Sequence, residues 1–451
     1  MLPVPARELI TRPDTRFQSD PIQLLMNNDN PHDHIVLATR AVACIQAGDF
    51  STALRLVSQA LAARPDSPPG LNALAMLSSR IGRGPEALRV LRRTIATHPA
   101  DPLTYFHLAR LHEDGHRPEE ALAILEQFFA NAASASLTSP KLLSSAFSLC
   151  DRLQHALAVK NQEAASEAVQ GLRENVEGLT GYPVIVVYGE MPEEWDSELT
   201  PAWQSRAGQH LIRCNSCVPR ALQPHLLARE MMRLEHWAQA RRAGAIRRFV
   251  VTPANIPCLM RRIGFTRPHI RRLLKQGWAM KTLSHAAEEQ MSLLLEILSG
   301  RPLELVIDTR VRARLPVLGP AQFLNLARFL AKQVDPAVLL AQEQILPRAL
   351  VRAGLALNCV KAILHDSLFP NTSSFHLAYT QTEIYPLAKR VWECWQAAAP
   401  SLGPGDEHRL VDAFAGVLGL RGCYEWALDP CSSSSEGNGP ETGQTQSLNT
   451  N

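Results

Sequence analysis

The chain contains 451 residues and carries a formal net charge of +3, with 46% hydrophobic and 20% charged residues. This composition excludes a broadly disordered chain, and any attraction to nucleic acid or membranes must be local. The length suggests two or three domains. No run of about 18 uncharged apolar residues occurs, so we expect no membrane partner. Nine scattered cysteines and a start without a signal-peptide pattern predict a cytoplasmic protein.

After an expected leader over residues 1–33, a 34-residue period runs through the sequence. Small residues and prolines recur in register in the two helices of each unit. These anchor positions are Ala41, Ala75 and Ala109, then Ala53, Ala87 and Ala121, and finally Pro65 and Pro99. Small residues let two antiparallel helices approach closely, and a proline stops the second helix. The pattern therefore predicts three helical hairpins over residues 34–133.

This period and its anchors resemble tetratricopeptide repeats. The resemblance implies an α-solenoid whose concave face binds a protein or peptide partner, and hence a scaffold function. Residues 134–177 are rich in Ala and Leu with interspersed charges, and we expect them to form capping or linker helices.

The second half of the chain changes character. The β-branched run between Gly181 and Gly189 predicts a strand, and residues 210–213 predict a second one. Helical periodicity then predicts a helix over residues 220–243 and five more. Those five cover residues 268–299, 320–334, 344–366, 378–398 and 406–427. We therefore expect a mainly α protein with an α+β, mostly helical domain over 178–431 whose seven tryptophans pack its core, followed by a disordered tail over 432–451.

The segment Arg229-Glu230-Met231-Met232-Arg233 resembles the HExxH helix of zincin-type metallopeptidases with both histidines replaced. In zincins with a glutamate third ligand, a downstream helix supplies that ligand. Asp308 is our preferred match for it and Glu304 the alternative, although this alternating run also fits a strand. Arginine has no acceptor lone pair. The resemblance thus implies a pseudo-peptidase without metal or other cofactor, in which Glu230 is a vestigial general base and Arg229, Arg233 and Asp308 occupy former ligand positions.

Three alternatives remain open for this helix. The first is an active zinc-dependent peptidase with a non-standard ligand set, sought among His225, His236, the cysteines and Asp308. The second is a solvated face formed by both histidines and both arginines. The third is an Arg229–Arg233 pair that binds a carboxylate or phosphate.

Two further patterns complete the sequence. Cys214-Asn-Ser-Cys217 is a lone C-x-x-C, which favours loop or core cysteines over redox or metal chemistry. Residues 236–287 contain eleven Lys or Arg, all within 241–281, and no Asp or Glu. This basic stretch indicates an intramolecular or protein-facing surface, with nucleic acid as a less favoured partner.

Taken together, these patterns favour a protein–protein interaction function over an enzymatic one. A zinc-dependent peptidase and a nucleic-acid-associated protein are the alternatives.

Overall fold

The computed structural model describes residues 34–134, 139–192, 195–205, 207–333 and 348–428. The leader expected over 1–33 and the disordered tail expected over 432–451 lie outside these residues. The described chain is mainly α-helical with a few short strands, as predicted. It divides into two compact units, and each is described by itself below.

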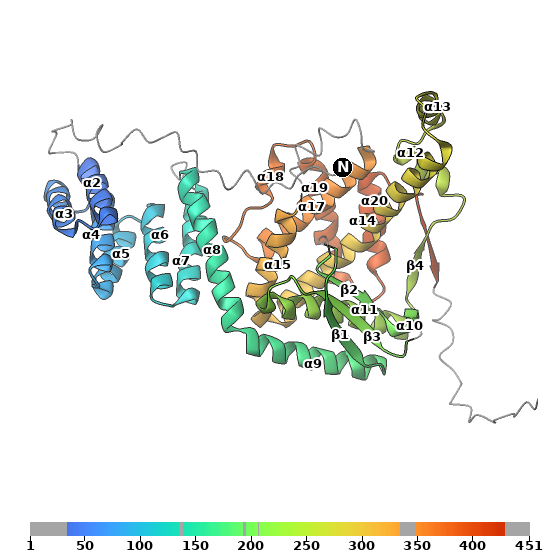
Figure 1. The fold of residues 1–451 in the computed structure, drawn as a ribbon, viewed down its shortest axis with the longest axis horizontal. Helices are drawn as coiled ribbons and strands as arrows, with labels where there is room; N and C mark the ends of the chain where they lie inside the picture. Colours follow the sequence, from blue (N-terminus) through green and yellow to red (C-terminus); the bar gives the residue numbers. More distant parts are fainter. Residues whose placement is uncertain (1–33, 135–138, 193–194, 206, 334–347, 429–451) are drawn as a thin grey trace, which may run out of the picture. The chain divides into compact units, whose positions relative to one another are not determined.

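Of the described residues, the first unit comprises 34–134, 139–163, 317–333 and 364–376. Three helix pairs begin it, and both the first and the second helices of these pairs start 34 residues apart. The pairs are α2 (His34–Ala47) with α3 (Phe50–Ala63), α4 (Pro68–Arg80) with α5 (Gly84–Thr97), and α6 (Pro102–Asp114) with α7 (Pro118–Ser134). Figure 1 shows the pairs following one another along the chain. Such consecutive short helices are compatible with a helical repeat.

The anchor residues lie where the period requires them. The six anchor alanines are at most 2% exposed, so neighbouring helices approach closely at each of them. Pro65 and Pro99 follow the ends of α3 and α5. Within the first two pairs, Gly48 and Gly82 turn the chain with φ of 82°, a left-handed conformation that glycine adopts without a Cβ penalty.

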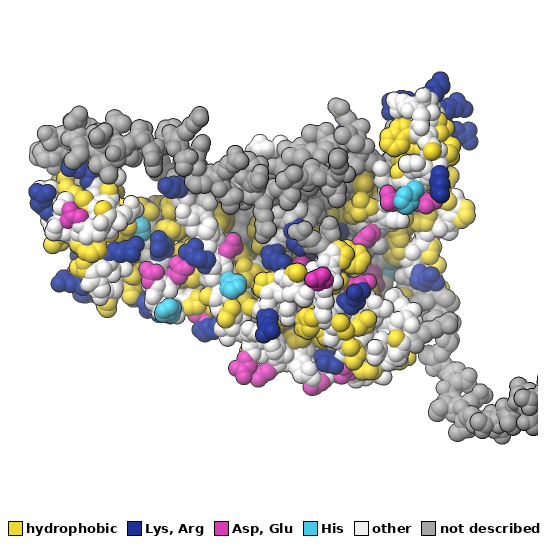
Figure 2. Space-filling model, in the orientation of Figure 1, with side chains coloured by type: hydrophobic (Ala, Val, Ile, Leu, Met, Phe, Trp, Pro, Cys, Tyr) yellow, Lys and Arg dark blue, Asp and Glu magenta, His cyan; other side chains and the backbone are white. Residues whose placement is uncertain are grey.

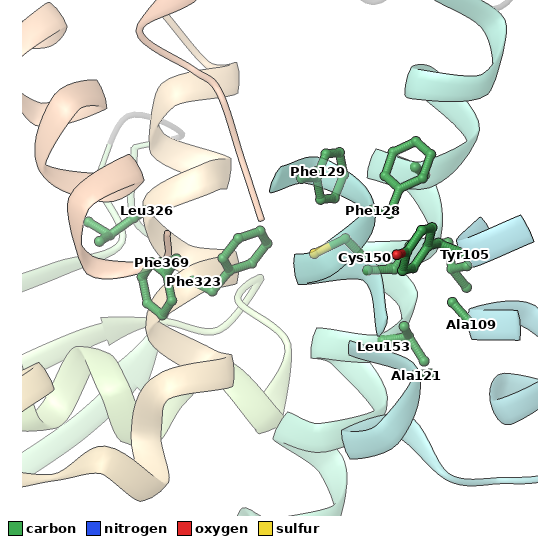
Figure 3. Close-up of a cluster of buried hydrophobic side chains, with 13 residues drawn as sticks. Tyr105, Ala109, Ala121, Phe128, Phe129, Cys150, Leu153, Phe323, Leu326 and Phe369 are labelled. Atoms are coloured by element: carbon green, nitrogen blue, oxygen red, sulfur yellow. The ribbon is translucent and has the colours of Figure 1, made fainter. Parts of the chain in front are cut away.

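The first unit also contains α8 (Pro140–Lys160), α15 (Gly319–Ala331) and the end of α17 (Arg348–Leu368). Figure 3 shows one of its hydrophobic clusters, in which Phe128, Phe129 and Cys150 belong to α7 and α8. Phe323 of α15 and Phe369, which follows α17, complete this cluster from a distant part of the chain. The expected domain over 178–431 therefore contributes two segments to the first compact unit.

Of the described residues, the second unit comprises 164–192, 195–205, 207–316, 348–363 and 377–428. A three-stranded sheet lies near its start, in the order β1-β3-β2, with β1 parallel and β2 antiparallel to β3. Its elements are α9 (Gln162–Thr180, from Ala164 on), β1 (Val184–Gly189), β2 (Ser197–Thr200), α10 (Ala202–Ser205), β3 (His210–Asn215) and α11 (Gln223–Arg242). Both predicted strands are confirmed, and β2 is an addition that the sequence did not predict.

The remaining elements of this unit are mostly helices. They are β4 (Arg247–Val250), α12 (Ile256–Arg262), α13 (Arg267–Lys275), α14 (Met280–Arg314), most of α17, α18 (Leu377–Thr380), α19 (Tyr385–Ala398), α20 (Glu407–Leu418) and β5 (Glu425–Leu428). Strands β4 and β5 pair antiparallel. The predicted helix over 268–299 is instead two helices, because Gly277 takes φ of 91° after α13. The predicted helix over 406–427 ends at Leu418, where Gly419 is left-handed.

Candidate functional site: a buried ion network

Helix α11 holds the candidate site residues of the second unit. The chain leaves β3 at Asn215, passes through a short loop and enters α11 at Gln223. This helix contacts β2 and β3 as well as α14. Because it is covered on more than one side, charged residues such as Glu230 become buried along with its apolar ones.

Arg229 and Asp308 form the centre of the network. Nε of Arg229 lies 3.0 Å from Oδ1 of Asp308, and the two side chains are 14% and 0% exposed. Asp308 belongs to α14, so the alternative of a strand over this run is wrong. The structure thus brings together two of the positions that the sequence singled out as former metal ligands.

Glu230 is held by two donors. Its Oε1 accepts a hydrogen bond of 2.8 Å from the Ser197 hydroxyl of β2. Its Oε2 accepts one of 2.6 Å from Nη1 of Arg233, one turn further along α11. Glu230 is only 2% exposed, so these bonds compensate for much of the cost of removing the carboxylate from water.

Lys361 extends the network from α17. Its Nζ donates to Oε2 of Glu304 at 2.7 Å and lies 4.0 Å from Oδ2 of Asp308. Arg301 also donates to Oε2 of Glu304, at 3.2 Å. Both candidates for the third ligand position, Glu304 and Asp308, therefore face cations.

The charges of the network shift the pKa values of its members. Burial disfavours the charged form of Arg229, but Asp308 and Glu304 outweigh this effect and raise its pKa. Burial also opposes ionisation of Glu304, yet Lys361 and Arg301 hold its pKa well below the usual range. The pKa of His225 falls well below its ordinary value, first through burial and then through the nearby Arg229 and Lys361 charges. His225 is therefore neutral.

His236 lies near the other end of α11 and has separate partners. Nη1 of Arg310 lies 2.7 Å from its Nδ1, and Oε2 of Glu407 lies 3.0 Å from its Nε2. Because arginine only donates, Nδ1 must accept and Nε2 carries the proton that bonds to Glu407. Both ring nitrogens are thus engaged, and His225 and His236 stand eleven residues apart, about 16 Å along the helix.

This geometry argues against two of the alternatives for α11. Arg229, Arg233, His225 and His236 are all largely buried, so the hypothesis of a solvated face is wrong. The structure also opposes the hypothesis that Arg229 and Arg233 together bind an external carboxylate or phosphate, because each guanidinium already forms an ion pair with a carboxylate of the protein.

Metal coordination needs several acceptor groups around one point. Within the described residues, no three or more His, Cys, Asp or Glu side chains gather closely enough to hold a metal ion. The carboxylates of the network face guanidinium and ammonium groups, whose charges would repel a divalent cation. The arrangement fits internal ion pairing.

The two cysteines of the C-x-x-C motif lie in different environments. Cys214 is buried in β3, where burial raises the pKa of its thiol to about 12, whereas Cys217 is exposed. A thiol with a raised pKa is a poor nucleophile.

Sequence reasoning missed three participants of the network. Ser197, Arg301 and Lys361 stand in no motif, and Lys361 lies more than fifty residues beyond Asp308. Only the packing of α11, β2, α14 and α17 brings them together.

Comparisons of the chain with protein-family models, with curated proteins and with solved structures find no match. Among the described residues, no helix combines the length and apolar character that a membrane crossing requires.

Proposed function

We propose that the protein is a tetratricopeptide-repeat scaffold whose first helices bind a protein or peptide partner, and whose second unit is a zincin-like domain with a closed, non-catalytic site. The observation that carries the first part is the 34-residue spacing of both helix series with buried alanine anchors. In such an array the anchors are used for packing, and the outward side chains of the first helices remain free for recognition.

Two exposed apolar side chains support a recognition surface on these helices. Ile35 of α2 is 52% exposed and Leu103 of α6 is 36% exposed. They occupy the same position of the period, two units apart, as the second residue of each helix. Apolar side chains repeated on one helix series suit the apolar residues of a protein partner.

The second part of the proposal rests on the order of elements around the ion network. A strand and a short loop precede α11, as they precede the active helix of a zincin, and the downstream helix α14 carries an acidic residue against it. Arg229 and Arg233 occupy the histidine positions of that outline. Their ion pairs with Asp308 and Glu230 keep the site closed without a metal.

The scaffold proposal is tested by comparing proteins that copurify with the tagged full-length chain and with two variants. Ile35→Arg/Leu103→Arg places two charges on the first helices. Leu54→Arg is the matched control, because Leu54 is 55% exposed on the second helix α3. We expect at least one partner to be lost from the double variant and kept by the control. Identical partner sets in all three samples, with unchanged circular dichroism, would contradict the proposal.

A further inference from the structure

The segment over residues 256–281, called the basic arm below, is not used by the proposed function. It contains α12, α13 and the start of α14. Its seven basic residues are Arg261, Arg262, Arg267, Arg271, Arg272, Lys275 and Lys281, and neither Asp nor Glu occurs between His236 and Ala287. Figure 2 shows basic and apolar side chains side by side over α13.

Helix α13 has two unlike faces. Arg267, Arg271 and Lys275 follow one another at four-residue spacing and are exposed, so they form one basic stripe. Ile270, Leu273 and Leu274 occupy the i, i+3 and i+4 positions of an apolar stripe beside it.

Among the described residues, the apolar stripe lies outside the hydrophobic cluster of this region, and its Ile270 and Leu273 side chains are half-buried. The hydrophobic cluster of this region takes Leu259 from α12 and Ala287 and Leu294 from α14, but no residue of α13. Leu274 remains 37% exposed. A nine-residue helix is marginal in water by itself, so an external surface that covers this stripe would stabilise it.

An exposed aromatic residue, Trp278, follows the end of α13. The Trp278 N–H donates to the Leu273 carbonyl at 3.2 Å, and the Gly277 N–H donates to that of Leu274 at 3.1 Å. This pair of bonds is the Schellman motif, which brings the residue after the left-handed glycine back beside the last turn of the helix. Trp278 is 52% exposed and Met280 is 55% exposed, so the expectation that all tryptophans pack the core is wrong at this position.

We propose that the basic arm binds the anionic surface of a lipid bilayer. Leu274, Trp278 and Met280 enter the interface between headgroups and acyl chains, and the basic stripe of α13 lies against the headgroup phosphates and carboxylates. A short helix with Lys and Arg on one face and Trp and Leu on the other has the chemistry of interfacial binding. The inference stands independently of the proposed function.

Nucleic acid fits this surface less well. It would use the basic stripe, and Trp278 could stack on a base. The exposed side chains of Leu274 and Met280 would stay in water, however, so nucleic acid would leave the apolar part of this surface uncovered. We expected no membrane partner because no spanning segment exists, but attachment to a surface requires none.

The test is flotation of the full-length protein with phosphatidylcholine vesicles that contain or lack phosphatidylserine. We expect binding to the anionic vesicles only, weakening as salt is added. Arg271→Gln/Lys275→Gln should reduce the partition coefficient by roughly 25-fold, about fivefold for each charge removed. Leu274→Ala/Trp278→Ala should reduce it at least tenfold, because the inserting apolar side chains are lost.

Two controls separate a specific site from general effects. Arg89→Gln/Arg93→Gln removes the same charge at the same spacing from exposed positions of α5 and should leave binding unchanged. Leu54→Ala removes an exposed apolar side chain outside the basic arm and should also leave binding unchanged. Circular dichroism confirms that each variant is folded.

Three results would overturn the inference. The first is that the native chain does not float with anionic vesicles, and the second is that the arm and control variants lose vesicle binding equally. The third is that the full-length protein binds a fluorescent single-stranded oligonucleotide through the arm but does not bind vesicles.

Discussion

In the proposed zincin-like domain, Arg229 and Asp308 occupy two former metal-ligand positions. The guanidinium has no lone pair to offer and stays protonated, so it supplies the positive charge that Asp308 would otherwise take from a metal ion. A 0% exposed carboxylate requires such a charge in the folded state. The ion pair therefore compensates the buried charge of Asp308 inside the proposed zincin-like domain.

Removing one member of this pair tests its role in stability. Arg229→Ala leaves Asp308 buried without its 3.0 Å partner, and we expect it to lower the free energy of unfolding by about 3–5 kcal/mol. Arg229→Met/Asp308→Leu removes both charges and should recover most of that loss, because it leaves no buried carboxylate uncompensated. Urea denaturation of the three proteins measures both effects. If Arg229→Ala were as stable as the native chain, Arg229 would not be compensating the buried charge of Asp308.

We expect buried histidines to make the folded protein less stable in mild acid. Burial lowers the pKa of His210 to about 4, whereas in the unfolded chain it is about 6.5. The unfolded state thus binds more protons between these values, so stability is complete above pH 6.5 and falls as the pH decreases toward 4. His225 shifts in the same direction. Carboxylates with a lowered pKa lose their stabilising effect only at still lower pH. Asp366, whose pKa is lowered to about 2, is an example.

We therefore expect the unfolding free energy to decrease between pH 6.5 and 4.5, by up to about 1.4 kcal/mol per pH unit for each such histidine. His210→Gln keeps an acceptor for the 2.9 Å bond from the Ala202 N–H and should flatten this slope. His285→Gln, at an exposed position, should not change it. Thermal unfolding across this pH range measures the slopes, and equal slopes in all three proteins would refute the assignment.

At the scale of elements, the helix pairs differ in how they turn. The first two pairs use Gly48 and Gly82 in the left-handed region, whereas the third places His116 there with φ of 55°. A side chain in this conformation costs about 1 kcal/mol or more. The backbone of the third turn is thus locally unfavourable, and the packing of α6 on α7 must offset this cost.

Substitution at these turns should have opposite effects. We expect His116→Gly to stabilise the protein by about 0.5–1 kcal/mol and Gly82→Ala to destabilise it by about 1 kcal/mol. No atom lies within 4 Å of a Cβ built at Gly82, so its effect is purely one of backbone conformation. Midpoints of urea unfolding measure both. A loss of stability in His116→Gly would show that its side chain matters more than its backbone.

Elements with a local signal could be predicted from the sequence, and elements made by distant contacts could not. The repeat helices and strand β1 carry their own periodicity or composition. By contrast, β4 and β5 pair across more than 170 residues, and neither has a distinctive pattern. Helix α14 was expected to end at 299, but it continues through Gly300 and Pro302 because Leu303, Val306 and Ile307 are buried after them.

The candidate site divides in the same way. The spacing of Arg229, Glu230 and Arg233 is a local feature of one helix, and the resemblance added Asp308 to it. Burial of both arginines could not be predicted, since their charge alone suggests exposure. Lys361 and Ser197 were missed because long-range packing alone places them near the network.

At the scale of the whole molecule, the two compact units carry different chemistry. The first presents repeated helices with exposed apolar positions, and the second has an ion network inside and a basic arm on its surface. None of these features requires a bound metal. The proposed functions are all recognition of other molecules.

We propose that arginine charges occupy the place of a metal in the second unit. The zinc content of the purified, untagged protein after incubation with zinc and removal of the excess tests it most directly. Arg229→His/Arg233→His is the comparator, because it restores two histidine ligands beside Asp308. We predict essentially no zinc in the native chain and about one zinc per chain in the variant. About one tightly bound zinc in the native chain, lost on Arg229→Ala or Asp308→Asn substitution, would contradict the account.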